Sequence, residues 1–334
     1  MNKMRILTDN LLTKADMKRF NSMDTSAIKP CKDILKGFVF NPEEAGKKEN
    51  GINLVKFSPG RSIQAFILFF LICLSGVNGQ VKIYIETDLE GVSGVYKFAQ
   101  TREKDTPLNI QACEYFMGDL AAVVRGLRDG GATEILIIDH HGNQAMIPHL
   151  MEPGAKYVTG SPKPGGTLWG IDESYSGIVI FASHAMMGTP DGVLNHTQSS
   201  RSENRYWYND VESGEIAQTA AIAGSYGIPP ILVTGDEATC REANKFFGPS
   251  VVTVATKQGV SREAAVLYPF EETRKALYEG AKKAVAAIPK CKPYIIKTPI
   301  KARMQYLDLD PKLPEPKLIT REWTITDVRN LLGR

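Results

Sequence analysis

Carboxylate and imidazole side chains follow three apolar segments of the chain at the points where those segments end. Asp88 and Glu90 come directly after the alternating segment 81–86, His141 follows a second apolar run, and His184 follows a third. If these segments are parallel strands, their carboxyl ends meet at one edge of a sheet, which is where ligands bind in such folds. Carboxylates and imidazoles together suit zinc or manganese. The residue types and their placement therefore predict a metal site at this edge.

Side chains along an extended segment point in alternating directions, and this separates candidate ligands from structural residues. Asp88 and Glu90 are two residues apart, so both can reach one metal ion. His140 points away from His141 if the segment is extended, and we expect it to be structural. Asp139 is expected either to cap a helix or to orient a ligand histidine.

The periodicity of apolar residues predicts the elements that position these side chains. Strands are expected at 81–86, 134–138, 177–182, 230–234 and 251–254, and helices at 109–128, 214–226, 236–247 and 271–287. Because strand and helix alternate, we expect an α/β fold with a three-layer, Rossmann-like core, a mostly parallel sheet and a smaller α+β portion. A short helix is expected near 325–332.

The segment 205–208 is an arginine followed by a tryptophan with one tyrosine on each side. This alternation predicts a half-buried strand. The alternative is that the aromatic side chains form a wall of a substrate pocket or a subunit contact.

Composition and charge restrict the class of protein. The 334 residues are 43% hydrophobic and 23% charged, as in globular proteins, which excludes a wholly disordered or fibrous chain. Residues 1–80 carry 12 lysines and arginines against 7 aspartates and glutamates, whereas the remainder carries 28 against 30. The body of the chain therefore lacks the basic surplus that nucleic-acid binding requires, and we expect no nucleic-acid partner.

A run of ten apolar residues, 65–74, follows Lys56 and Arg61 and precedes the small residues of 75–79. The run is shorter than the roughly 20 residues of a spanning helix, so no stable membrane span is expected. The pattern is typical of a signal peptide at about 61–79, within a leader of residues 1–80. It predicts a secreted or periplasmic protein, the alternatives being a buried core segment and a cytoplasmic protein.

The remaining histidine and the cysteines add little chemistry. His149 follows a proline in a loop and is expected at the surface. The five cysteines have no spacing typical of a metal site, and we expect buried thiols without a disulfide framework; they are Cys31, Cys73, Cys113, Cys240 and Cys291.

Longer motifs extend over residues 81–290 in a fixed order. They are Thr87–Gly94, Asp139–His141, Ser183–Ala185 with Thr189, Pro190 and Gly192, Asn195–Thr197, Asn209–Asp210 with Gly214–Glu215, Gly235–Asp236, and Lys257–Gln258 with Ser261–Arg262. The ordered set resembles the DppA-like D-aminopeptidase family, peptidase family M55. An extra Asp191 within the third motif departs from the family pattern. The resemblance implies a catalytic region at 81–290 and a C-terminal extension at 291–334.

The resemblance also implies roles for six residues at a site with two zinc ions. Asp88 would bridge both ions, Glu90 and His184 would complete one, and His141 and Glu215 would complete the other. His196 would be the catalytic residue, which the family describes as a nucleophile. We favour an acid/base role for His196, because a metal-bound hydroxide already supplies an attacking group.

The predicted function is therefore that of a zinc-dependent aminopeptidase. It would hydrolyse the N-terminal residue of short peptides that contain D-amino acids, such as D-alanine peptides. The family resemblance implies a homo-oligomeric ring such as a decamer. The alternatives are a dinuclear metal phosphoesterase or amidase, and a non-catalytic peptide-binding protein.

Overall fold

The computed structural model describes residues 79–142, 145–161, 163, 168–312 and 314–332. The expected signal-peptide segment lies outside these residues except for its last position, as do Cys31 and Cys73. No helix in the described part of the chain is both long enough and apolar enough to cross a membrane. Cys113 is a buried free thiol, and Cys240 and Cys291 are partly buried free thiols.

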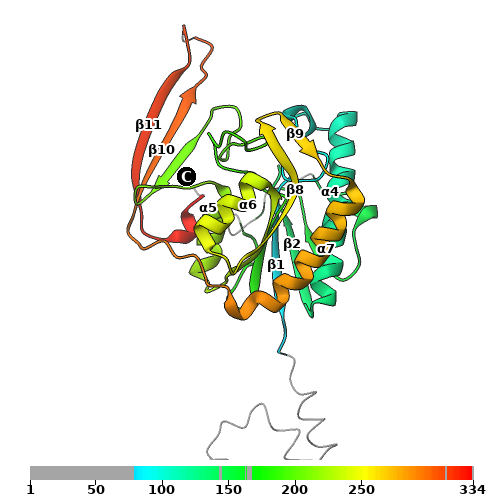
Figure 1. Cartoon of the computed structure of the whole chain (residues 1–334). Helices are drawn as coiled ribbons and strands as arrows, with labels where there is room; N and C mark the ends of the chain where they lie inside the picture. The colour runs from blue at the N-terminus through cyan, green and yellow to red at the C-terminus, as the bar shows by residue number, and fades with distance from the viewer. Residues whose placement is uncertain (1–78, 143–144, 162, 164–167, 313, 333–334) are drawn as a thin grey trace, which may run out of the picture. The chain divides into compact units, whose positions relative to one another are not determined.

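A seven-stranded sheet forms the centre of the molecule (Figure 1). Its spatial order is β3-β2-β1-β4-β7-β8-β9, and every neighbouring pair is parallel except β8 with β9. The strands are β1 (Lys82–Thr87), β2 (Glu134–Asp139), β3 (Lys156–Val158), β4 (Gly177–Phe181), β7 (Pro230–Asp236), β8 (Val252–Ser261) and β9 (Ala264–Leu267). The expected strands are confirmed, and the sheet is mostly parallel as predicted.

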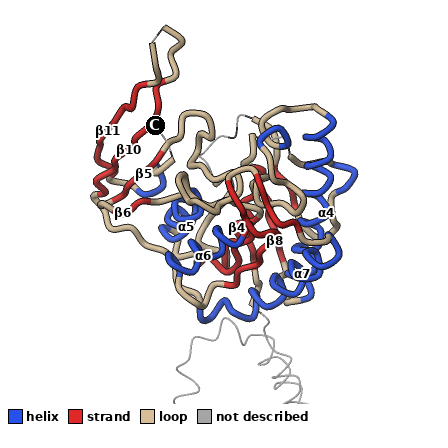
Figure 2. Tube along the Cα trace, turned by 45° about the horizontal axis from the view of Figure 1, so that its top comes forward, coloured by secondary structure: helices blue, strands red, loops and turns tan. Residues whose placement is uncertain are grey.

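Helices cover both faces of this sheet (Figures 1 and 2). They are α4 (Pro107–Asp129) and α7 (Phe270–Ala287) on one face, and α5 (Glu215–Ser225) and α6 (Glu237–Phe247) on the other. Alternation along β1 explains the layering, because Ile83 and Ile85 pack with α4 and α7, whereas Tyr84 packs with residues of α5. The three-layer core is therefore confirmed. Short 3-10 turns lie at Phe98–Gln100, Pro148–Leu150 and Ile288–Lys290.

A second, antiparallel sheet has the order β11-β10-β5-β6. Its strands are β5 (Arg205–Tyr208), β6 (Val211–Glu212), β10 (Ile300–Asp308) and β11 (Lys317–Ile325). The half-buried strand expected at 205–208 is confirmed, and it pairs directly with β10. Figure 1 shows that the β10–β11 hairpin extends away from the α/β core.

The prediction of a helix near 325–332 is wrong. Residues up to Ile325 belong to β11, in which Ile325 pairs with Ile300, and only Val328–Asn330 forms a 3-10 turn. The reason is that β-branched residues in 317–325 favour a strand, and the long-range partner β10 supplies the pairing.

The strand order reverses beside β1, since β2 and β3 continue to one side of it and β4, β7 and β8 to the other. The crevice beyond the carboxyl ends of β1 and β4 is where ligands bind in doubly wound sheets. The chain segments that leave these two strands contact each other there, since the Gly91 N–H donates to the Ala182 carbonyl at 2.7 Å. A Cβ at position 91 would lie 2.2 Å from the Ser183 carbonyl oxygen, so this crossing requires glycine.

Candidate metal centre

Six side chains converge on this crevice, and they are the six that the sequence predicted. Asp88 and Glu90 follow β1, His141 follows β2, His184 follows β4, His196 lies on the loop after β4, and Glu215 begins α5. Strand ends deliver the first four, whereas the last two come from a loop and a helix N-terminus. Glu90, His184 and His196 are buried, being 3%, 2% and 8% exposed.

Asp88 lies between two histidines. Its Oδ1 is 2.9 Å from His141 Nδ1, and its Oδ2 is 3.2 Å from His184 Nε2. Glu90 Oε2 lies 3.1 Å from His141 Nδ1, and Glu215 Oε1 lies 3.4 Å from His184 Nε2. Asp88 is therefore the carboxylate that contacts both histidines. Glu90 contacts His141 and Glu215 contacts His184, whereas the resemblance grouped Glu90 with His184 and His141 with Glu215.

Main-chain carbonyls determine which nitrogen of each ring faces the carboxylates. His141 Nε2 lies 2.9 Å from the Thr101 oxygen, and His184 Nδ1 lies 3.0 Å from the Ala185 oxygen. A carbonyl only accepts, so each of these nitrogens carries a hydrogen. The other nitrogen of each ring then points at two carboxylates, which is the arrangement in which a histidine presents its lone pair to a metal.

Two buried atoms of the centre lack a hydrogen bond to any described residue, although one lies near an imidazole nitrogen and the other near two carboxylates. They are Glu90 Oε2 and His184 Nε2. Buried polar atoms are normally satisfied, so these two require a partner. Two groups have donor atoms within 4.8 Å of one another, namely Asp88 with Glu90 and His184, and His184 with His196 and Glu215. The residues present thus fit a metal with nitrogen and oxygen ligands.

Burial and mutual charge shift the pKa values of the centre. Burial disfavours the charged form of His141, but Glu90 and Asp88 outweigh this effect and raise its pKa well above the usual 6.5. Burial raises the pKa of Glu215, but the charge and hydrogen bond of His184, with the hydrogen bond from the Gln198 N–H, lower it to about 2. Burial also disfavours the charged form of Asp88, but His141 and His184 outweigh this effect and lower its pKa well below the usual 3.8, so Asp88 and Glu215 remain ionised near pH 7.

His196 differs from the other two histidines. Burial and the neighbouring charge of His184 lower the pKa of His196, so its ring is neutral near pH 7. Its Nδ1 donates to the Leu194 oxygen at 2.7 Å, which leaves Nε2 as the acceptor, 3.9 Å from Glu215 Oε1. The edge of Phe98 contacts the ring, with centroids 6.2 Å apart. A neutral, oriented imidazole beside the ligands suits proton transfer.

The other predictions for polar residues have mixed outcomes. His140 points away from the centre and lies 3.0 Å from Glu86, and His149 is exposed, both as expected. Within the described part of the chain, Asp139 hydrogen-bonds neither to a helix N-terminus nor to a histidine, so that prediction is wrong. Its carboxylate accepts from the Ala145 N–H and the Thr159 hydroxyl, because the chain after β2 folds back over it.

Sequence reasoning did not assign two residues that support the centre. Lys257 of β8 is fully buried and donates to the main-chain oxygens of Glu90 and Val92 at 2.6 and 2.8 Å. The Gln198 N–H donates to Glu215 Oε1 at 2.5 Å, and Gln198 has a φ of 63°. Lys257 could have been found from the sequence, because it is a lysine within an otherwise uncharged strand. No sequence pattern indicates Gln198.

Comparisons with known proteins indicate the family and the fold of the chain. The model of peptidase family M55, described as D-aminopeptidase, matches residues 81–310. A D-aminopeptidase of Bacillus subtilis (strain 168) is 29% identical over 221 residues, which cover 64% of this chain and 77% of the relative. A similar solved structure is that of Zn-dependent D-aminopeptidase DppA from Bacillus subtilis, which is described as a self-compartmentalizing protease. It matches this chain with a TM-score of 0.67 and 22% sequence identity, and the match covers 75% of this chain and 94% of that one. The structural likeness supports the α/β fold.

Proposed function

The chain is a member of the D-aminopeptidase family, peptidase family M55, and on this premise we propose that it is a zinc enzyme that removes the N-terminal residue of short peptides containing D-amino acids. The related DppA structure is described as Zn-dependent. We further propose two zinc ions per chain, with Asp88 between them and Glu90, His141, His184 and Glu215 as the other ligands.

The observation that carries this proposal is the orientation of the histidine rings. His141 and His184 each donate one N–H to a main-chain carbonyl and turn the other nitrogen toward two carboxylates. His184 Nε2 makes no hydrogen bond to any described residue despite this proximity. A bound cation would satisfy the imidazole and the carboxylates at once.

The chain's own residues would perform the remaining steps. Bound zinc supplies a Lewis acid for the peptide carbonyl and lowers the pKa of water. His196 Nε2, held neutral and oriented by the Leu194 carbonyl, would accept a proton and deliver it to the leaving amine. Asp88 and Glu90 would keep the ligand histidines in place, and Lys257 would hold the Glu90 loop through its main-chain oxygens.

We also propose a homo-oligomer. The reason is that the related DppA is described as self-compartmentalizing, and an enclosed chamber would restrict access to short peptides. Light scattering on the purified chain tests this proposal, and a clean monomer at working concentration would contradict it.

Metal content and hydrolysis together test the proposed activity. Mass spectrometry of the unchelated chain should find about two zinc ions per chain, and D-Ala-Gly should be cleaved faster than L-Ala-Gly. Chelation should abolish cleavage, and added zinc should restore it. A chain that holds zinc but cleaves neither peptide, or prefers the L-peptide, would contradict the proposal.

A further inference from the structure

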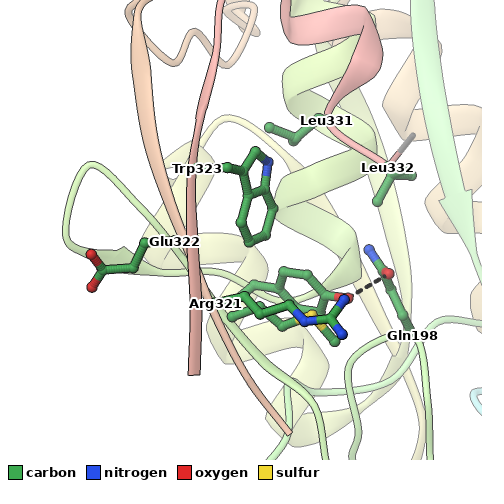
Figure 3. Close-up of a pocket in the computed structure, with 8 residues that line it drawn as sticks. Gln198, Arg321, Glu322, Trp323, Leu331 and Leu332 are labelled. Carbon is green, nitrogen blue, oxygen red and sulfur yellow. Dashed lines mark hydrogen bonds between the residues drawn. The ribbon is translucent and has the colours of Figure 1, made fainter. Parts of the chain in front are cut away.

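A hollow of about 450 Å³ lies against strands β10 and β11 (Figure 3). Its lining residues come from the loop after β4, from strands β5, β10 and β11 of the second sheet, and from the C-terminal segment; they are Gln198, Tyr206, Met304, Arg321, Glu322, Trp323, Leu331 and Leu332. The volume is of the size that small-molecule sites have. The family match ends at residue 310, so much of this wall lies beyond the matched region.

Gln198 connects the hollow to the catalytic residues. Its N–H donates to Glu215 Oε1 at 2.5 Å, while its side-chain oxygen accepts from the Tyr206 hydroxyl at 2.8 Å. A glutamine at a φ of 63° is strained, and such residues persist where the surrounding structure requires them. A group bound in the hollow would therefore contact Gln198, the residue whose N–H donates to the proposed zinc ligand Glu215.

Strand register determines which side chains face the hollow. Tyr206, Met304 and Arg321 are opposite one another across β5, β10 and β11, and Trp323 is two residues from Arg321 on the same face. Figure 3 shows that Glu322 points away from the side on which Trp323, Leu331 and Leu332 lie. The side chains on this face are mostly apolar and aromatic, with the Gln198 amide and one cation, Arg321, as the polar exceptions besides the Tyr206 hydroxyl.

That cation, Arg321, has no carboxylate partner within the described residues. Its guanidinium lies 5.3 Å from the ring centroid of Tyr306. Trp323 is 36% exposed, so its ring is also available to a ligand. A guanidinium without a carboxylate partner among the described residues, two positions along the same strand from an exposed indole, matches a ligand with a carboxylate and an apolar side chain.

We infer that this hollow binds the part of the substrate that follows the cleaved bond. The inference rests on the proposed function, because an aminopeptidase that acts on short peptides releases a product with a free carboxylate. Arg321 would bind that carboxylate, and Trp323 with Met304 and Leu332 would contact an apolar side chain. The chain would thus prefer dipeptides with a large apolar second residue and an unmodified C-terminus.

The test measures kcat/KM of the full, zinc-loaded chain for D-Ala-Phe, D-Ala-Gly and D-Ala-Phe-amide. The wild type should favour D-Ala-Phe over D-Ala-Gly by about tenfold, as burial of an aromatic side chain predicts. The preference should be lost in Trp323→Ala, and Arg321→Gln should lose the discrimination between D-Ala-Phe and its amide, mainly through KM. Glu322→Gln, on the same strand but pointing away, is the matched control and should keep both ratios.

A second measurement separates this inference from the proposed function. Calorimetry with a reduced-amide analogue of D-Ala-Phe, which cannot be hydrolysed, reports binding without turnover. Tighter binding to the wild type than to Trp323→Ala and Arg321→Gln supports the inference even if no peptide is cleaved. Unchanged ratios and affinities in both variants would overturn it. A loss of oligomer mass in the variants without a change in affinity would also overturn it, and would assign the hollow to a contact between copies.

Discussion

The rings of His184 and His196 are stacked, with centroids 3.8 Å apart and planes 13° from parallel. They differ in what their free nitrogens face. His184 Nε2 lies 3.2 Å from Asp88 and 3.4 Å from Glu215, whereas His196 Nε2 lies 3.9 Å from Glu215. This arrangement separates a proposed ligand from a proposed proton carrier within one stacked pair.

Substitution of His196 tests this separation. We expect His196→Gln to retain the metal, because the remaining ligands are intact, and to lower kcat by about 10²–10⁴, which is typical of a lost general acid/base. Steady-state kinetics and metal analysis of the same preparation measure both quantities. Loss of about half of the zinc would instead identify His196 as a ligand.

Substitution of Asp88, unlike that of His196, should lower the zinc content of the chain. Asp88→Asn removes the charge between His141 and His184, so we expect the zinc content to fall and hydrolysis to stop. The thermal stabilisation that added zinc gives the wild type, about 4 kcal/mol at a thousandfold excess over Kd, should be lost as well. Glu86→Gln is the control, since Glu86 lies on the same strand and contacts His140. Full zinc binding by Asp88→Asn would exclude a bridging role.

The alternation of strands and helices made the α/β core predictable, and with it the positions of Asp88, Glu90, His141 and His184. These four lie at strand ends, where local pattern and sheet topology coincide. His196 and Glu215 are different, because a loop and a helix N-terminus bring them to the centre. Only the motif resemblance indicated these two.

Features that depend on long-range contacts were not predictable from local pattern. Lys257 reaches the Glu90 loop from a strand far along the chain, and Gln198 acts through its main-chain N–H, which any residue type offers. The hairpin of β10 and β11 was missed because its pairing partner, β5, is distant in sequence. Asp139 was expected to cap a helix or to orient a ligand histidine because it ends a strand, but its carboxylate accepts from loop groups instead.

The close crossing at Gly91 should be intolerant of any side chain. A Cβ there would lie 2.2 Å from the Ser183 oxygen and 2.4 Å from the Ala182 carbonyl carbon. We expect Gly91→Ala to lower the free energy of unfolding by about 1–3 kcal/mol, as overpacking does, and to weaken zinc binding because the segments before Glu90 and His184 must separate. Urea unfolding and zinc titration measure the two effects. Gly79→Ala is the control, because no atom lies within 4 Å of its added Cβ. If Gly91→Ala unfolded and bound zinc like the wild type, the two chain segments could move apart without loss of stability, and the prediction would be wrong.

The last prediction concerns Glu242, which supports the loop after His184. Its buried carboxylate accepts the Met186 N–H at 3.0 Å and the Thr189 hydroxyl at 2.7 Å. Burial raises the pKa of Glu242 above the usual 4.5, although these hydrogen bonds oppose the shift. The folded chain therefore holds this proton more tightly than the unfolded chain, so the contribution of Glu242 to stability is greatest below pH 4.5 and falls as pH rises through its folded pKa. Urea unfolding of the chelated wild type and Glu242→Gln between pH 4 and pH 8 should show the wild type losing stability relative to the variant as pH increases. A relative gain with increasing pH would mean that the hydrogen bonds to Met186 and Thr189 outweigh burial.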